Sequence, residues 1–150
     1  MASPQIQEFE VNTARDALAM LSRLVYEKFG KEALPLIAGV CHKLGVASGG
    51  KMKGDMSTSG LKAAGEAFMV GVRKRKSPVE VLEMSDEKLY IRGYRCALGL
   101  ANTSRELCEA MMAMDKAIFE TSSGKKLNLE IAKTVAAGDP YCDTIYTVVK

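Results

Sequence analysis

The 150-residue sequence contains no tryptophan and a single histidine, and aromatic residues make up only 6% of it. Proteins that bind single-stranded nucleic acid stack bases on aromatic side chains along basic grooves. Here the net charge is a modest +3, and the only dense basic run is Arg73 to Lys76. We expect this run to be a solvated helix end, where cations are favoured, and we expect no nucleic-acid partner.

The sequence also lacks membrane and export signals. It has no run of about 18 uncharged apolar residues, and residues 1–11 have neither the basic start nor the apolar stretch of a signal peptide. We therefore expect a cytoplasmic protein with no membrane partner. Because 47% of the residues are hydrophobic, which is enough for one core, residues 1–150 are predicted to form a single domain, with 1–11 a candidate disordered segment.

Several catalytic motifs are missing as well. There is no GxSxG, no P-loop and no GxGxxG preceded by a strand, so a classical serine hydrolase and a nucleotide cofactor are not expected. No two cysteines form a CxxC pair, which argues against a zinc ribbon. In a chain without an export signal, four cysteines favour free thiols or metal ligands over a disulfide framework.

Helical periodicity predicts three helices in the N-terminal half, over about residues 12–30, 32–45 and 58–77. Asn12 is the predicted N-cap of the first helix. Between the second and third helices, residues 45–60 are rich in glycine, serine and threonine and are predicted to form a flexible loop. Long loops of this kind often cover binding sites.

The C-terminal half is predicted to be a ββ-α-ββ unit, because β-branched and aromatic residues cluster in short runs on both sides of one helical pattern. The predicted strands span residues 79–84, 89–94, 129–138 and 142–150, and the helix spans 104–119. Asp139 and Pro140 suit the turn between the last two strands. The predicted fold class is α+β, with an antiparallel sheet of about four strands and the helices packed on one face.

Three cysteines are predicted to approach one end of this sheet. Cys96 follows the second strand, Cys108 lies on the fourth helix and Cys142 begins the last strand. Three thiolates with a fourth ligand or a water would suit zinc, so these residues are candidate metal ligands. The alternative is that each cysteine is a small buried hydrophobe, which is the commoner role of a free cysteine.

An acidic residue interrupts the apolar face of the fourth helix. Asp115 lies two turns after Cys108 and on the same face. Either it reaches solvent at an edge, or it faces a pocket where burial would raise its pKa and suit it to acid–base catalysis. Met111 and Met112 are candidate ligand contacts on this helix, although such a stripe is more often ordinary core. His42, the only histidine, is expected at the surface.

Three C-terminal segments carry a family resemblance: "YRCALGL" (94–100), "LCEAMMAMD" (107–115) and "KTVAAGDPYCDTIY" (133–146). Together they resemble the L-2-amino-thiazoline-4-carboxylic acid hydrolase-like family. The matching positions are Cys96, Cys108, Glu109, Asp115, Lys133, Thr134, Gly138, Asp139, Cys142 and Asp143. The resemblance implies hydrolysis of a C–N bond in a small cyclic amidine or thiazoline, with Cys108 and Asp115 catalytic and with Thr134 and Asp139 contacting the ligand.

The resemblance leaves two routes open. In a covalent route, Cys108 would attack as a thiolate and Asp115 would orient it or accept a proton. In a metal-assisted route, the cysteines would hold a metal that lowers the pKa of a bound water.

The C-terminal half also looks like the vinyl-reductase-type small-molecule-binding domains, which share the fold of certain vesicle-tethering subunits. Some sensors of that group bind zinc through cysteines and a glutamate. Cys108 and Cys142 match two of those positions, but Thr134 and Ile131 stand at the others. The alternative function is thus a non-catalytic small-molecule-binding or sensor domain. A third interpretation is a structural homodimer whose helices supply the interface.

Overall fold

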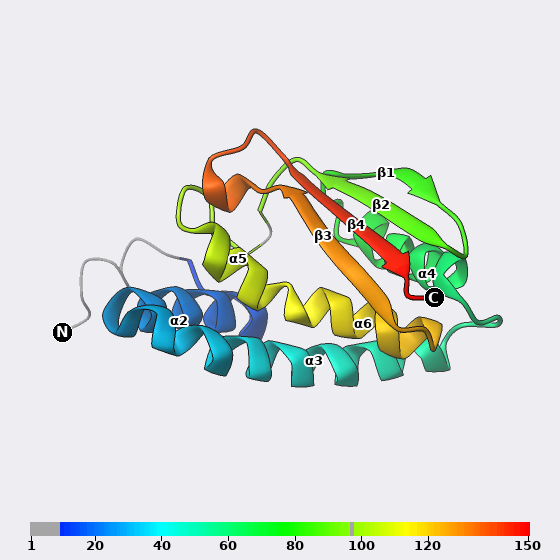
Figure 1. Ribbon diagram of the computed structural model, residues 1–150, viewed down its shortest axis with the longest axis horizontal. Coiled ribbons are helices and arrows are strands. Elements are labelled where there is room, and N and C mark those ends of the chain that lie inside the picture. The colour runs from blue at the N-terminus through cyan, green and yellow to red at the C-terminus, as the bar shows by residue number, and fades with distance from the viewer. Residues whose placement is uncertain (1–9, 97) are drawn as a thin grey trace.

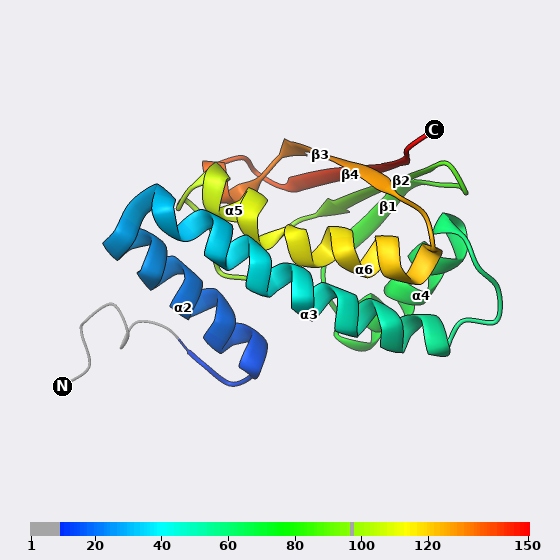
Figure 2. The same cartoon turned by 60° about the horizontal axis from the view of Figure 1, so that its bottom comes forward.

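The computed structural model describes residues 10–96 and 98–150, so most of the predicted N-terminal disordered segment lies outside the described residues. A layer of helices covers one face of a four-stranded antiparallel sheet, and the other face of the sheet is left open (Figures 1 and 2). This is the predicted α+β architecture. Within the described ranges no helix is both long enough and apolar enough to cross a membrane.

The elements follow the predicted order. The helices are α2 (Ala14–Phe29), α3 (Leu34–Gly54), α4 (Leu61–Lys74), α5 (Arg105–Met111) and α6 (Ala113–Ser123), with short 3-10 turns η1 (Gly30–Ala33) and η2 (Val135–Ala137). The strands are β1 (Val79–Met84), β2 (Lys88–Gly93), β3 (Leu127–Lys133) and β4 (Cys142–Val148). They lie side by side in the order β1-β2-β4-β3, so the last strand fills the centre of the sheet beside the first hairpin.

The first helix is fixed by local signals at both ends. Its N-cap is Thr13, one residue after the predicted Asn12, and Thr13 forms a capping box with Asp16. The helix stops at Gly30, which has a φ of 70° that a residue with a side chain rarely adopts. The predicted stop at this glycine is confirmed.

The prediction of a flexible loop from residue 45 is wrong, because α3 continues to Gly54. Gly45 and Gly49 lie one turn apart on α3 and are buried against α6. A Cβ atom at Gly49 would lie 2.7 Å from the carbonyl oxygen of Ile118, and one at Gly45 would overlap the carbonyl oxygen of Met114. These glycines therefore allow two helix backbones to touch rather than ending a helix, and only residues 55–60 connect α3 to α4.

Two further predictions change in detail. The helix predicted over 104–119 is two helices that meet at Met112, and the second extends to Ser123. The strand predicted over 129–138 ends at Lys133, because Thr134 caps the short turn η2 with its side chain.

The core lies between the sheet and the helices. Leu89, Ile91 and Tyr146 project from the sheet into this layer, where they are buried. The ring of Phe119 on α6 meets Tyr146 edge-on, with ring centroids 4.7 Å apart. This packing holds α6 against β4, and Tyr146 also lines a cavity.

Candidate functional site: a cavity between the sheet and the helices

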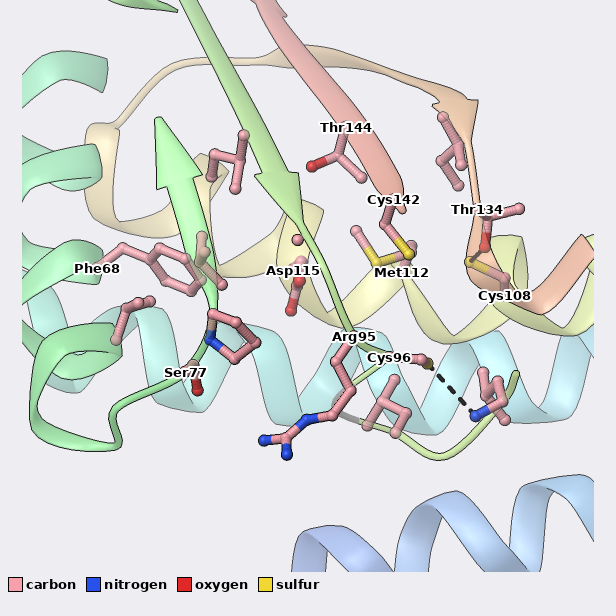
Figure 3. Close-up of a pocket in the computed structure, with 18 of the residues that line it drawn as sticks. Phe68, Ser77, Arg95, Cys96, Cys108, Met112, Asp115, Thr134, Cys142 and Thr144 are labelled. Carbon is pink, nitrogen blue, oxygen red and sulfur yellow. Dashed lines mark hydrogen bonds between the residues drawn. The ribbon is translucent and has the colours of Figure 1, made fainter. Parts of the chain in front are cut away.

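A cavity of about 160 Å³ lies between the helical side of the sheet and helices α4, α5 and α6 (Figure 3). Apolar side chains, including Phe68, Ile91 and Met112, make up much of its wall. A protein cavity of roughly 150 Å³ is large enough to bind benzene. The cavity therefore has room for a molecule built around a single ring.

Asp115 brings a carboxyl group into this apolar wall. It lies in the first turn of α6. The side chain as a whole is 20% exposed, whereas its Oδ1 atom is buried and has no hydrogen-bond partner among the described residues. A guanidinium nitrogen of Arg15 lies 3.9 Å from this oxygen, which is too far for a hydrogen bond.

The environment of Asp115 favours its neutral form. Burial raises the pKa of this carboxyl, and the positive charges of Arg15 and Arg75 oppose the shift only in part. Of the two alternatives left by the sequence, the edge position and the pocket position, the structure shows the pocket position.

Cys96, Cys108 and Cys142 all line this cavity, and none is in a disulfide. Each sulfur accepts a hydrogen bond from the protein. Cys108 Sγ accepts from the Thr134 hydroxyl at 3.2 Å, Cys142 Sγ from the Val135 amide at 3.3 Å, and Cys96 Sγ from the Leu100 amide at 3.4 Å.

The arrangement of these thiols does not fit a zinc site. In the part of the chain that the structure describes, no three His, Cys, Asp or Glu side chains are grouped so that they could hold a metal ion. Burial also raises the pKa of Cys96, and it raises the pKa of Cys108 to about 11. Both groups are therefore protonated thiols at neutral pH in the free protein.

The other predicted site residues divide into two groups. Met112 and Thr134 line the cavity. Met111 is instead fully buried in the core, and Asp139 lies outside the cavity, where its carboxylate accepts the backbone N–H of Thr134 at 2.9 Å. Asp139 thus holds the loop that carries Thr134. His42 is exposed, as predicted, although it lies in the middle of α3.

Three arginines were missed by reasoning from the sequence. Arg15 on α2, Arg75 at the end of α4 and Arg95 after β2 line the same cavity as Asp115, and Figure 3 shows Arg95 beside it. Arg75 belongs to the basic run that was predicted to be a solvated helix end. No signal in the sequence indicates that arginines from three separate elements line one cavity, because that depends on how those elements pack.

The alternation of β4 could have located part of the site. Cys142, Thr144 and Tyr146 line the cavity, while Asp143 between them points to the opposite face of the sheet. There Asp143 is held by Arg92 and by the Tyr90 hydroxyl, which donates to it at 2.7 Å. These contacts lower the pKa of Asp143, the Arg92 hydrogen bonds most of all, and they bind β4 to β2 beside the cavity.

Comparison with known proteins gives a matching family and several solved structures of similar fold. A family model described as L-2-amino-thiazoline-4-carboxylic acid hydrolase matches residues 12–146. The chain is similar to the phenol-responsive sensory domain of the transcription activator PoxR with phenol, with a TM-score of 0.65 and 15% identity, over 93% of this chain and 76% of that one. No curated protein matches the sequence.

The second similar fold is trafficking protein particle complex subunit 3 from Naegleria fowleri, covalently bound to palmitic acid. Its TM-score is 0.64 at 11% identity, over 91% of this chain and 95% of that one. At such identities the two likenesses show the fold alone. Both folds agree with the predicted one, which resembles vinyl-reductase-type domains and certain vesicle-tethering subunits.

Proposed function

Because the chain belongs to the L-2-amino-thiazoline-4-carboxylic acid hydrolase family, we propose that its cavity binds a small single-ring molecule of the cyclic amidine or thiazoline type. One observation carries the proposal: Asp115 Oδ1 is buried at the cavity without a hydrogen-bond partner in the described chain. Leaving such an atom unpaired costs about 1–3 kcal/mol. A ligand N–H or O–H that donates to this oxygen would remove the cost.

The rest of the cavity suits the same class of ligand. The apolar wall formed by Phe68, Ile91 and Met112 can contact the faces of a ring. Arg15, Arg75 and Arg95 add positive charge that favours an anionic substituent, such as the carboxylate of an amino-thiazoline acid. The ligand would then place a donor at Asp115 and an acidic group toward the arginines.

Hydrolysis by this site is supported by the raised pKa of Asp115. A carboxyl group with a raised pKa can accept a proton from an attacking water and pass it to the leaving nitrogen as the C–N bond breaks. The covalent route through Cys108 has less support. With a pKa of about 11, about one Cys108 side chain in ten thousand is a thiolate at pH 7.

A non-catalytic sensor domain is the second candidate. Its support is the fold, which is similar to that of a phenol-responsive sensory domain. Phenol has one ring and one donor, which is what the cavity and Asp115 would require. In this case the ligand would bind at Asp115 and leave unchanged.

Titration calorimetry with L-2-amino-thiazoline-4-carboxylic acid and with phenol tests the proposal. Replacing Asp115 with Leu removes the acceptor and keeps a similar volume, so we expect the affinity to fall at least about tenfold. Glu66→Leu removes an exposed acid on α4 and is the matched control. An affinity that is the same in wild type and Asp115→Leu would overturn the role of Asp115. Chromatography of the recovered ligand separates hydrolysis from simple binding.

A further inference from the structure

Helix α2 presents large apolar side chains to solvent and buries small ones. The residues that it buries are Ala19 and Ser22. Leu21 and Phe29, by contrast, are 61% and 60% exposed. In a surface helix of a globular protein, the large apolar side chains normally face the core. The packing of α2 in the single chain is therefore the reverse of what its residues favour.

The exposed apolar side chains of α2 lie on one side of the helix and continue on α3. Leu21 and Phe29 are eight residues apart, just over two helical turns, so both project from the same side of α2. Leu36 and Val40 lie one turn apart on α3 and are 71% and 56% exposed. The two helices are joined by the short turn η1, and both lie on the side of the molecule away from the sheet (Figures 1 and 2). These four residues define the α2–α3 face.

We propose that the α2–α3 face binds the same face of a second copy of this chain, so that the protein is a two-fold symmetric homodimer. Two-fold dimers are the commonest assemblies of soluble proteins. A two-fold axis places the same patch on both sides of the interface, so the apolar side chains of each copy would cover those of the other. The dimer goes beyond the proposed function and does not depend on what the cavity binds.

The size and composition of this surface suit a dimer. Between Ala14 and Gly54, 22 residues are exposed, and a stable interface takes about 20–30 residues from each partner. Charged residues of both signs adjoin the apolar side chains. Lys28 lies beside Phe29, with its Nζ 5.6 Å from the ring centroid, and Lys31 and Glu32 are exposed in η1. This arrangement corresponds to the apolar core and polar rim of an interface.

The outer face of the sheet is also open, but its polar side chains already pair with one another. Arg92 and the Tyr90 hydroxyl hold Asp143. The Tyr94 hydroxyl donates to Glu80 at 2.6 Å. Polar groups that are satisfied in this way are stable in contact with water. We therefore place the interface on the helices and not on the sheet.

A second copy would also brace α2 against the rest of the protein. Near its end, α2 is held by the Tyr26 hydroxyl, which donates to Glu106 at 3.1 Å and lies 3.2 Å from the Ser104 hydroxyl. Near its start, Arg15 lies 3.9 Å from Asp115 Oδ1, which is too far for a hydrogen bond. Because Arg15 lines the cavity, a dimer would hold this part of the cavity wall in place.

Light scattering coupled to size-exclusion chromatography of the full chain tests the proposal. We expect a mass twice that of one chain. Leu21→Glu and Leu36→Glu each place a charge inside the interface, where burying it unpaired is costly, so each variant should be a monomer. Leu82→Glu changes an exposed leucine on β1 and is the matched control, which should remain a dimer. A monomeric wild type, a dimer that survives both helix substitutions, or one that dissociates in Leu82→Glu would overturn the proposal.

Cross-linking of the wild type decides the question if a helix variant does not fold, which circular dichroism would show. A lysine-reactive cross-linker that joins a lysine to the same lysine can only have joined two chains. We expect such links, identified by peptide mass spectrometry, at one or more of Lys28, Lys31 and Lys43, which lie on α2, η1 and α3. Links of this kind found only at Lys88 or Lys133, on the strands, would contradict the proposal, as would their absence.

Vesicles that contain phosphatidylserine separate a second copy from a membrane as the occupant of the α2–α3 face. A wild type that stays monomeric and sediments with these vesicles would assign the face to a membrane and overturn the dimer. Asp115-dependent ligand binding by a monomeric protein would support the proposed function while the dimer fails. A dimer whose ligand binding is the same in Asp115→Leu would support the interface while the proposed function fails.

Discussion

Arg92 donates to both carboxylate oxygens of Asp143, at 2.8 and 3.0 Å, on the face of the sheet opposite the cavity. The two residues are register partners on β2 and β4. Because Asp143 lies between Cys142 and Thr144, this ion pair holds the strand whose alternate side chains line the cavity.

The ion pair predicts a pH-dependent loss of stability in Asp143→Asn. The pKa of Asp143 is lowered in the fold. The contribution of Asp143 to stability is therefore fully present above its unfolded pKa, near 4, and is lost as the pH falls through its pKa in the folded protein. We expect the variant to melt at a Tm on the order of 5 °C lower at pH 7. The difference from wild type should shrink toward pH 2. Thermal unfolding at pH 7 and at pH 2 measures this Tm difference. A difference that grows at low pH would contradict the stabilising role of the Arg92–Asp143 ion pair.

Asp115 predicts a pH dependence of stability that is opposite to that of Asp143. Its pKa is raised in the fold, so the stability of the wild type falls as the pH rises from the unfolded pKa through the folded one. Asp115→Asn should therefore increase the free energy of unfolding at pH 7, by on the order of 1 kcal/mol. The gain should vanish below the unfolded pKa. Urea unfolding across this pH range checks it, and a variant that is less stable at neutral pH would show that the carboxylate is paired in solution.

The contact between α3 and α6 predicts different outcomes at two adjacent glycines. A Cβ atom at Gly49 would lie 2.7 Å from the Ile118 carbonyl oxygen and 2.9 Å from Thr121 Cβ, so Gly49→Ala should cost about 1–3 kcal/mol. A Cβ atom at Gly50 meets nothing within 4 Å. Gly50→Ala is therefore the matched control and should add about 0.5–1 kcal/mol of helix stability. Equal effects in chemical denaturation would mean that the two helices do not pack this closely.

The thiols predict that the folded protein does not depend on zinc. Elemental analysis of protein purified without chelator should find zinc well below one ion per chain, and EDTA should leave Tm unchanged, because the cavity cysteines are not grouped as ligands among the described residues. Near-stoichiometric zinc that disappears in Cys108→Ser and Cys142→Ser would restore the metal-site interpretation.

Local patterns predicted the parts of the fold that local interactions determine. The hairpin of β1 and β2 and the end of α2 at Gly30 follow from strand alternation and from a glycine that needs a positive φ. Gly45 and Gly49 misled the prediction because their role is set by α6, a segment far along the chain. A glycine that breaks a helix and one that lets another helix approach look alike in a sequence.

The candidate site was also predicted only in part from the sequence. Cys96, Cys108, Met112, Asp115 and Cys142 were identified from residue type and spacing, and Thr134 from the family resemblance. All six line the cavity. Met111 is one residue from Met112 and belongs to the core. The break between α5 and α6 at Met112, which sets the direction of both side chains, has no marker such as proline.

The most direct test follows the Asp115 carboxyl carbon by NMR through a pH titration, with and without L-2-amino-thiazoline-4-carboxylic acid. We predict a raised pKa in the free protein and a lower pKa with ligand, because an N–H donated to Oδ1 stabilises the carboxylate. The titration of Asp143, on the opposite face of the sheet, should not change. An ordinary pKa for Asp115 that is indifferent to the ligand would contradict the proposal that this cavity receives its ligand at Asp115.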